Sequence, residues 1–170
     1  MELFEDMVQK YYSAVYNFLL KLSNYNNDVA EELTQDTFLQ AYLSAPDFKG
    51  KCQLKTWLIQ IAKNCFYMNL RKQKHRLVSL DDMPAEPIDT TAKPLSDSLY
   101  EHELVVKANL IIDSMQSPMK DVMPYRIYTD LPYAQIALLL SISENSTKVL
   151  FHRGKKILQK KLKENFGYEI

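Results

Sequence analysis

Glycine is scarce in this sequence, since only Gly50, Gly154 and Gly167 occur among 170 residues. Strand-like alternation of polar and apolar residues is also absent over most of the chain, and hydrophobic residues recur instead at three- and four-residue intervals. All-β folds need many turns, and glycine is common in those turns. The scarcity of glycine and the helical spacing therefore predict an all-α protein.

The chain also has few of the residues that build disulfide frameworks and metal sites. Its two cysteines, Cys52 and Cys65, form no CxxC motif, and its three histidines are scattered. A disulfide framework is therefore not expected. The sequence contains no Ser/His/Asp set, glycine-rich phosphate loop or metal-ligand spacing. We expect no cofactor and no catalytic residues, so an enzyme is the weakest functional alternative.

Long hydrophobic runs are absent as well. No apolar run approaches the ~20 residues that span a bilayer. The first residues include Glu2, Glu5 and Asp6, which is not typical of a signal peptide. These features predict a cytoplasmic protein.

Net charge is also lacking, because the formal charge is +0, but the charges are unevenly distributed. Residues 49–76 contain eight Lys or Arg and no acid, and residues 148–163 contain seven and no acid. Residues 28–42 are acidic and contain no Lys or Arg. Two basic blocks on a neutral chain favour nucleic-acid binding, whereas the acidic segment suits a basic protein surface.

Hydrophobic spacing predicts two groups of helices. Asp28 is the expected N-cap of one helix, and Ser44–Asp47 is expected to end it. Residues 77–96 are acidic, contain three prolines and predict an irregular linker. The predicted helices cover residues 3–23, 28–42, about 54–74, about 97–115, 118–129, 133–140 and 144 onward. We therefore expect two small helical domains, 1–76 and 97–170.

Residues 131–158 carry a helix-turn-helix pattern. Residues 133–140 predict one helix, Ser141–Ser143 a tight turn, and Glu144 the start of a second helix. Thr147, Phe151, Gly154 and Leu158 should face the core. The side chains expected to face DNA are Lys148, Val149, His152, Arg153, Lys155 and Lys156.

Residues 28–42, 46–50 and 56–64 together resemble region 2 of bacterial sigma factors, specifically the extracytoplasmic-function class, group IV of the sigma-70 family. Residues 131–162 resemble region 4 of the same family. The resemblance implies an alternative sigma factor that binds core RNA polymerase, directs it to specific promoters and assists melting of the −10 element. It assigns region 2 to residues 1–76, the linker to residues 77–96 and region 4, which binds the −35 element, to residues 97–170.

The resemblance also implies partners and binding residues. The acidic helix would bind the clamp helices of the polymerase β′ subunit, and the β subunit is a further partner. An anti-sigma factor, often membrane-attached in this family, is expected too. The implied polymerase-binding residues are Glu32, Gln35, Asp36 and Gln40.

The residues predicted to bind the −10 element are chosen partly from the chemistry of their side chains and partly from the resemblance. Basic side chains on one helix face suit phosphate binding, the Asn64 amide can read a base edge, and Phe48 can stack on a base. By resemblance, Asn64 and the loop before its helix form a pocket for an unpaired base. The full −10 set is Ser44, Phe48, Lys49, Lys51, Lys63, Asn64 and Arg71.

Two departures from the family pattern and three alternatives accompany this interpretation. Pro124 lies where sigma factors usually carry leucine, so a distorted helix is expected there, and Ser141 replaces the glycine often found in the turn. A stand-alone helix-turn-helix regulator would explain residues 131–158 but not residues 28–76. The acidic residues could also form an ordinary solvated face, and the linker a passive tether.

Overall fold

The computed structural model describes residues 2–79 and 96–169, and these form α-helices, one short 3₁₀ helix and no strand. The prediction of an all-α fold is confirmed. The predicted linker falls mainly on residues 80–95, outside the described residues. The elements are α1 (Glu2–Leu22), α2 (Asn27–Ser44), η1 (Ala45–Asp47), α3 (Leu54–Ser79), α4 (Ser96–Asp113), α5 (Met119–Tyr128), α6 (Tyr133–Leu140) and α7 (Glu144–Phe166).

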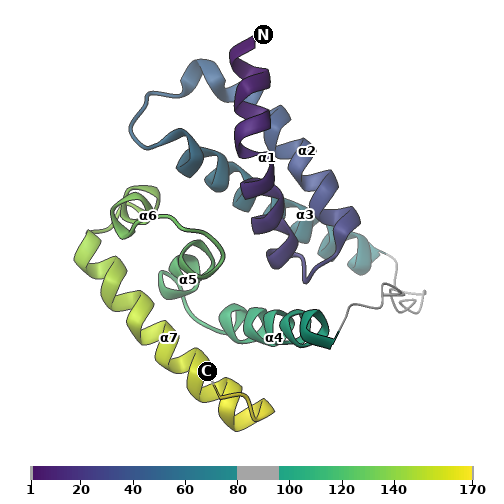
Figure 1. The fold of residues 1–170 in the computed structure, drawn as a ribbon, viewed down its shortest axis with the longest axis vertical. Helices are drawn as coiled ribbons and strands as arrows, with labels where there is room; N and C mark the ends of the chain where they lie inside the picture. Colours follow the sequence, from purple (N-terminus) through teal and green to yellow (C-terminus); the bar gives the residue numbers. More distant parts are fainter. Residues whose placement is uncertain (1, 80–95, 170) are drawn as a thin grey trace.

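Residues 2–79, the N-terminal half, form a three-helix bundle of α1, α2 and α3 (Figure 1). Each helix contributes an apolar stripe to the interior. The most deeply buried side chains include Phe18 and Leu19 of α1, Leu33 of α2, and Leu58 and Ile59 of α3. Burial of large side chains from all three helices fixes the position of the outward faces of α2 and α3.

The ends of these helices differ from the sequence prediction in two places. Asn26, rather than Asp28, caps α2, because its side chain accepts a hydrogen bond from the Val29 amide at 3.1 Å. Helix α3 continues to Ser79, past the expected end near Lys74 and past the domain boundary expected at residue 76. The first three residues assigned to the linker are therefore helical.

Residues 96–169, the C-terminal half, place α4, α5 and α6 against the long helix α7 (Figure 1). Pro124 lies inside α5 and is buried. The helix continues past it to Tyr128 rather than ending there. A Cβ atom on Gly154 of α7 would lie 2.4 Å from Sδ of Met123. Glycine at residue 154 therefore lets α7 approach α5 closely.

The helix-turn-helix prediction is confirmed in detail. Helix α6 ends at Leu140, and α7 begins at Glu144. Ser141 adopts the left-handed conformation, with φ of 54°, at the position where glycine is often found. The Ser143 hydroxyl caps α7 by accepting a hydrogen bond from the Ser146 amide at 3.0 Å.

The two halves share part of their hydrophobic core. Tyr125 and Tyr128 of α5, Leu131, and Ile136 of α6 belong to the same buried cluster as the interior of the N-terminal bundle. The rings of Phe18 and Tyr125 stack with centroids 6.3 Å apart. Figure 1 shows α5 at the centre of the molecule, between α3 and α7. None of the helices in the described ranges is long and apolar enough to cross a membrane.

Candidate polymerase and nucleic-acid interfaces

Helix α2 presents a polar face to solvent because its opposite face is fully engaged. Leu33, Thr34, Thr37 and Phe38 are buried. The Thr34 and Thr37 hydroxyls each donate to the carbonyl four residues earlier at 2.6 Å, which satisfies them inside the bundle. All of the predicted polymerase-binding side chains are exposed: Glu32, Gln35, Asp36 and Gln40.

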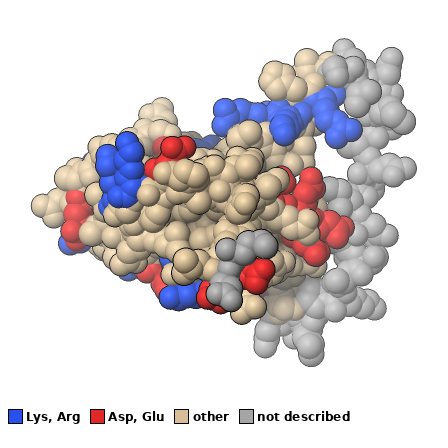
Figure 2. All heavy atoms as spheres, turned by 90° about the horizontal axis from the view of Figure 1, so that it is seen from above, with Lys and Arg blue, Asp and Glu red and all other residues tan. Residues whose placement is uncertain are grey.

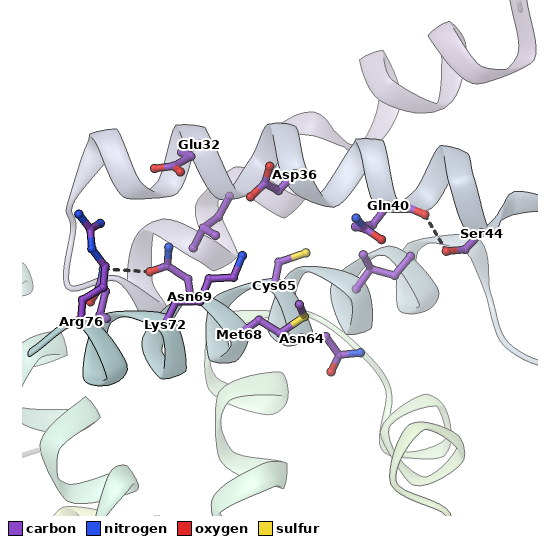
Figure 3. Close-up of a pocket in the computed structure, with 13 residues that line it drawn as sticks. Glu32, Asp36, Gln40, Ser44, Asn64, Cys65, Met68, Asn69, Lys72 and Arg76 are labelled. Atoms are coloured by element: carbon purple, nitrogen blue, oxygen red, sulfur yellow. Dashed lines mark hydrogen bonds between the residues drawn. The ribbon is translucent and has the colours of Figure 1, made fainter. Parts of the chain in front are cut away.

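Three of these side chains line a groove between α2 and α3 with a volume of about 720 Å³. Glu32, Asp36 and Gln40 come from α2, and Asn64 comes from α3 (Figure 3). Ser44 lies at the end of α2, where its hydroxyl donates to the Gln40 carbonyl at 2.7 Å. The structure therefore joins part of the predicted polymerase site and part of the predicted −10 site in one groove.

The groove also contains α3 residues that were not predicted as site residues. Met68 and Lys72 follow Asn64 at intervals of four residues, and the same wall includes Asn69 and Arg76. That spacing places Asn64, Met68 and Lys72 on one helix face, so it could have identified them from the sequence. The groove has acids on its α2 wall and basic and amide groups on its α3 wall (Figure 3).

The loop between α2 and α3 forms a second hollow, of about 310 Å³. Phe48 packs on Trp57 with ring centroids 4.7 Å apart and a tilt of 34°. Lys49 and Lys51 line the same hollow and are exposed. Its other wall, Leu138 and Leu139, belongs to α6 in the C-terminal half. The predicted −10 loop is thus placed directly beside the helix-turn-helix.

Lys63 does not lie on the exposed face where it was predicted. Only 5% of Lys63 is exposed, and its ammonium donates to the Asp121 carbonyl at 3.1 Å. The ammonium also lies 3.6 Å from Asp121 Oδ1 and 4.3 Å from the Tyr125 ring centroid. Burial lowers the pKa of Lys63, and the Asp121 carboxylate opposes that shift. Consecutive helix residues point about 100° apart, so Lys63 faces α5 while Asn64 faces the groove.

The basic residues of α3 that follow Lys63 are exposed, whereas Lys55 near the start of the helix is partly buried. Arg71 is exposed, and its Nε donates to the Tyr67 carbonyl at 3.4 Å. Figure 2 shows, on the face seen from above, separate groups of basic side chains with acidic groups between them. The predicted −10 residues are therefore distributed over the groove, the loop hollow, the α5 contact and, for Arg71, the exposed surface of α3.

The predicted −35 residues do share one outward face of α7. Lys148, Val149, His152, Arg153, Lys155 and Lys156 are all exposed. On the inner face of α7, Thr147, Gly154 and Leu158 are buried, as predicted, and Phe151 is partly buried. Lys148 pairs with Glu144 one turn earlier at 2.9 Å, a contact that a DNA phosphate would have to replace. Among the described residues, no group of three or more His, Cys, Asp or Glu could hold a metal ion.

Comparison with known proteins identifies this arrangement. Residues 7–76 match the family model for Sigma-70 region 2. The RNA polymerase sigma factor YlaC of Bacillus subtilis is 27% identical, with 93% of this chain and 91% of that protein covered. The ECF RNA polymerase sigma factor SigM of the same organism is 24% identical, with 91% and 92% covered.

Solved structures share the fold. The sigma factor RpoE of Bartonella quintana, solved with the anti-sigma factor NepR, matches with a TM-score of 0.65 and 21% identity, covering 96% of this chain and 98% of that one. CnrH, solved with the cytosolic domain of CnrY, matches with a TM-score of 0.63 and 16% identity, covering 95% and 88%.

A region 2 bundle followed by an exposed helix-turn-helix defines a bacterial sigma factor. Residues 7–76 belong to the Sigma-70 region 2 family, and the chain is similar over more than nine-tenths of its length to ECF RNA polymerase sigma factors such as SigM and SigW, so it is an alternative sigma factor of transcription initiation. The alternative of a stand-alone helix-turn-helix regulator leaves the region 2 match over residues 7–76 unexplained.

Proposed function

We propose that the chain binds core RNA polymerase through the exposed face of α2 and directs it to promoters whose two elements are read by separate helices. The acidic side chains of Glu32 and Asp36 would meet a basic surface on the clamp helices of the β′ subunit. The observation that carries this assignment is the exposure of every predicted side chain on a helix whose other face is fully buried.

The −10 element would be held along α3 and the loop before it. Asn64 offers a donor and an acceptor to an unpaired base. Lys72 lies about two helical turns further along the groove, where it would contact phosphate. Phe48 packs on Trp57 at the edge of the loop hollow and would stack on a second base. The α3 residues that line the groove would therefore contribute both base recognition and backbone binding.

The −35 element would be read by α7. Recognition helices of the helix-turn-helix type contact bases through their N-terminal residues, which here include Lys148, Val149 and His152. Arg153, Lys155 and Lys156 lie one turn further along the same exposed face. Polymerase would perform the chemistry, and the factor would act in the cytoplasm without a catalytic role of its own. As a related fold, RpoE, is solved with the anti-sigma factor NepR, we also propose an anti-sigma partner.

The test is binding to core polymerase after reversal of the α2 charges. Glu32→Lys with Asp36→Lys should abolish co-elution with core polymerase, because both carboxylates would be replaced by charges that repel a basic surface. Both residues are exposed, so helicity and thermal stability should change little. Glu164→Lys with Glu169→Lys makes the same change of charge near the end of the chain and should leave binding intact. Unchanged polymerase affinity in the α2 variant would refute the assignment.

A further inference from the structure

Methionine is concentrated where α5 packs against α7. Three of the seven methionines fall within residues 115–123. Met119 and Met123 lie four residues apart on α5, which places them on one face of that helix. Both side chains lie against Gly154 of α7, because a Cβ atom there would be 3.2 Å from Cγ of Met119 and 2.4 Å from Sδ of Met123. Two methionines therefore close over the glycine that lets α7 approach α5.

Met119 also borders a groove on the surface of the C-terminal half. The groove has a volume of about 500 Å³ and lies between the α4–α5 turn and the second half of α7. Met115 and Met119 line one side, and Ile157 lies on the other. Met119 is only partly buried, whereas Met123 is 0% exposed. A small solute can therefore reach Met119 from the groove, while the protein shields Met123.

The thioether sulfur distinguishes methionine from other apolar side chains. Leucine fills a similar volume, and exchanges between the two residues are usually tolerated. Hydrogen peroxide oxidises the thioether. A sulfur lone pair attacks one peroxide oxygen, the O–O bond breaks, a sulfur–oxygen bond forms, and the other oxygen leaves as water with both hydrogens. Sulfur loses two electrons and the peroxide gains them. The product, methionine sulfoxide, is polar and disrupts apolar contacts.

A polar group at residue 119 would act on the helix that carries the −35 residues. These residues, from Lys148 to Lys156, lie on both sides of Gly154 along α7. A sulfoxide at residue 119 would either place its oxygen beside Gly154 or turn the side chain into the groove. Each outcome removes apolar contact between α5 and α7, because a polar group is costly to bury without a hydrogen-bond partner.

We propose that Met119 is an oxidation site at which a hydroperoxide forms the sulfoxide, loosens α7 from α5 and weakens −35 binding. The inference rests on the proposed −35 role of α7. Methionine sulfoxide reductases return the sulfoxide to methionine, with one enzyme for each epimer. The protein would therefore lose promoter binding in the presence of peroxide and regain it after enzymatic reduction.

The test is treatment of the full-length protein with hydrogen peroxide, followed by peptide mass spectrometry of each methionine. Catalase removes the peroxide before any further measurement. Met119 should be oxidised several-fold faster than Met123, and hydrogen exchange of the α7 amides should then become several-fold faster. Holoenzyme assembled from the oxidised chain and untreated core polymerase should bind a −35 duplex several-fold more weakly. Binding is scored on the fraction that co-elutes with polymerase.

Reversal separates methionine oxidation from cysteine oxidation. Cys52 and Cys65 are free, and dithiothreitol reduces disulfides and sulfenic acids formed by such thiols but not methionine sulfoxide. Dithiothreitol alone should therefore leave −35 binding low. Addition of the methionine sulfoxide reductases for both epimers should restore it.

Matched variants identify the residue. Met119→Leu keeps an apolar side chain of similar size without the sulfur, so α7 exchange and −35 binding should survive peroxide. Met7→Leu replaces a methionine of α1 that is also partly buried, and this variant should lose −35 binding in peroxide as the unaltered chain does. Met119→Gln introduces a polar group directly and should weaken −35 binding without peroxide. Circular dichroism checks that the three variants fold, which is expected because neither methionine is fully buried.

Four results would overturn the proposal. These are equal oxidation rates at Met119 and Met123, unchanged α7 exchange after oxidation of Met119, loss of −35 binding by Met119→Leu in peroxide, and recovery of binding with dithiothreitol alone. Faster α7 exchange with unchanged −35 binding would have a different meaning. It would refute the proposed −35 role of α7 while still supporting an oxidation-sensitive contact between α5 and α7.

Discussion

The two basic helices, α3 and α7, differ in how the rest of the chain uses their charges. Two lysines of α3 pair with acids of the other half, Lys63 with Asp121 and Lys55 with Asp130. Two lysines of α7, Lys148 and Lys160, pair with glutamates four residues away on the same helix. Two lysines of α3 therefore help to hold the two halves together, whereas the two paired lysines of α7 remain on the exposed surface of their own helix.

The comparison teaches that a basic block does not by itself locate a DNA surface. Pairs within one helix are worth a few tenths of a kcal/mol and leave the side chains in solvent. A pair that is buried between two halves removes the lysine from solvent altogether. Whether a lysine stays in solvent or becomes buried depends on where its side chain points relative to the apolar stripe of its helix.

The largest expected effect concerns α7. Arg153→Ala should weaken binding to the −35 duplex by ~1–3 kcal/mol and relax its sequence preference, because a guanidinium that reads base edges would be removed. Equilibrium binding of holoenzyme to matched and altered −35 duplexes measures both quantities. Lys63→Ala provides the comparison on α3, and the same change of −35 preference in that variant would contradict the difference between the helices.

An intermediate effect is expected from removal of the buried charge. Lys63→Met combined with Asp121→Leu replaces both charges of the pair with apolar side chains of similar size, so the free protein should become more stable by about 1 kcal/mol. Chemical denaturation followed by circular dichroism measures the change. Lys155→Met on the exposed face of α7 is the matched control and should change stability by less than about 0.5 kcal/mol. A destabilised double variant would show that the α5 contact depends on the charged pair more strongly than burial suggests.

The smallest effect should come from the far end of α7. Lys160 and Lys161 lie beyond the N-terminal half of the helix, and Lys161 donates to the Ser114 hydroxyl at 3.3 Å. Replacing either with alanine should weaken binding to all sequences alike and lower the salt dependence by roughly one unit of slope for each lysine–phosphate pair that is removed. Salt titrations on two unrelated duplexes measure this effect. A change in sequence preference would place these lysines among the base-reading residues instead.

The helices and the helix-turn-helix could be predicted from the sequence because their signals are local. Apolar spacing marked the buried faces, and the Ser141–Ser143 turn was located correctly. The cap of α2 was placed two residues late because Asn26 and Asp28 are both good caps, and only the geometry shows which side chain reaches the Val29 amide.

The surroundings of the site residues were harder to predict because they depend on contacts between distant segments. Lys63 was expected in solvent but faces Asp121, a residue far along the chain. Helical spacing identifies residues that share a face, as for Asn64 and Lys72, but it does not show whether another helix will cover that face.

A promoter-variant panel with reconstituted holoenzyme tests the central claim, that −10 opening and −35 reading belong to different helices. Each promoter is scored separately for duplex binding and for strand opening. Asn64→Ala should leave −35 binding intact and impair opening at −10, because its amide is assigned to an unpaired base. Arg153→Ala should weaken −35 binding and relax its preference. Altered −35 preference in the Asn64 variant, or a defect confined to −10 opening in the Arg153 variant, would contradict the account.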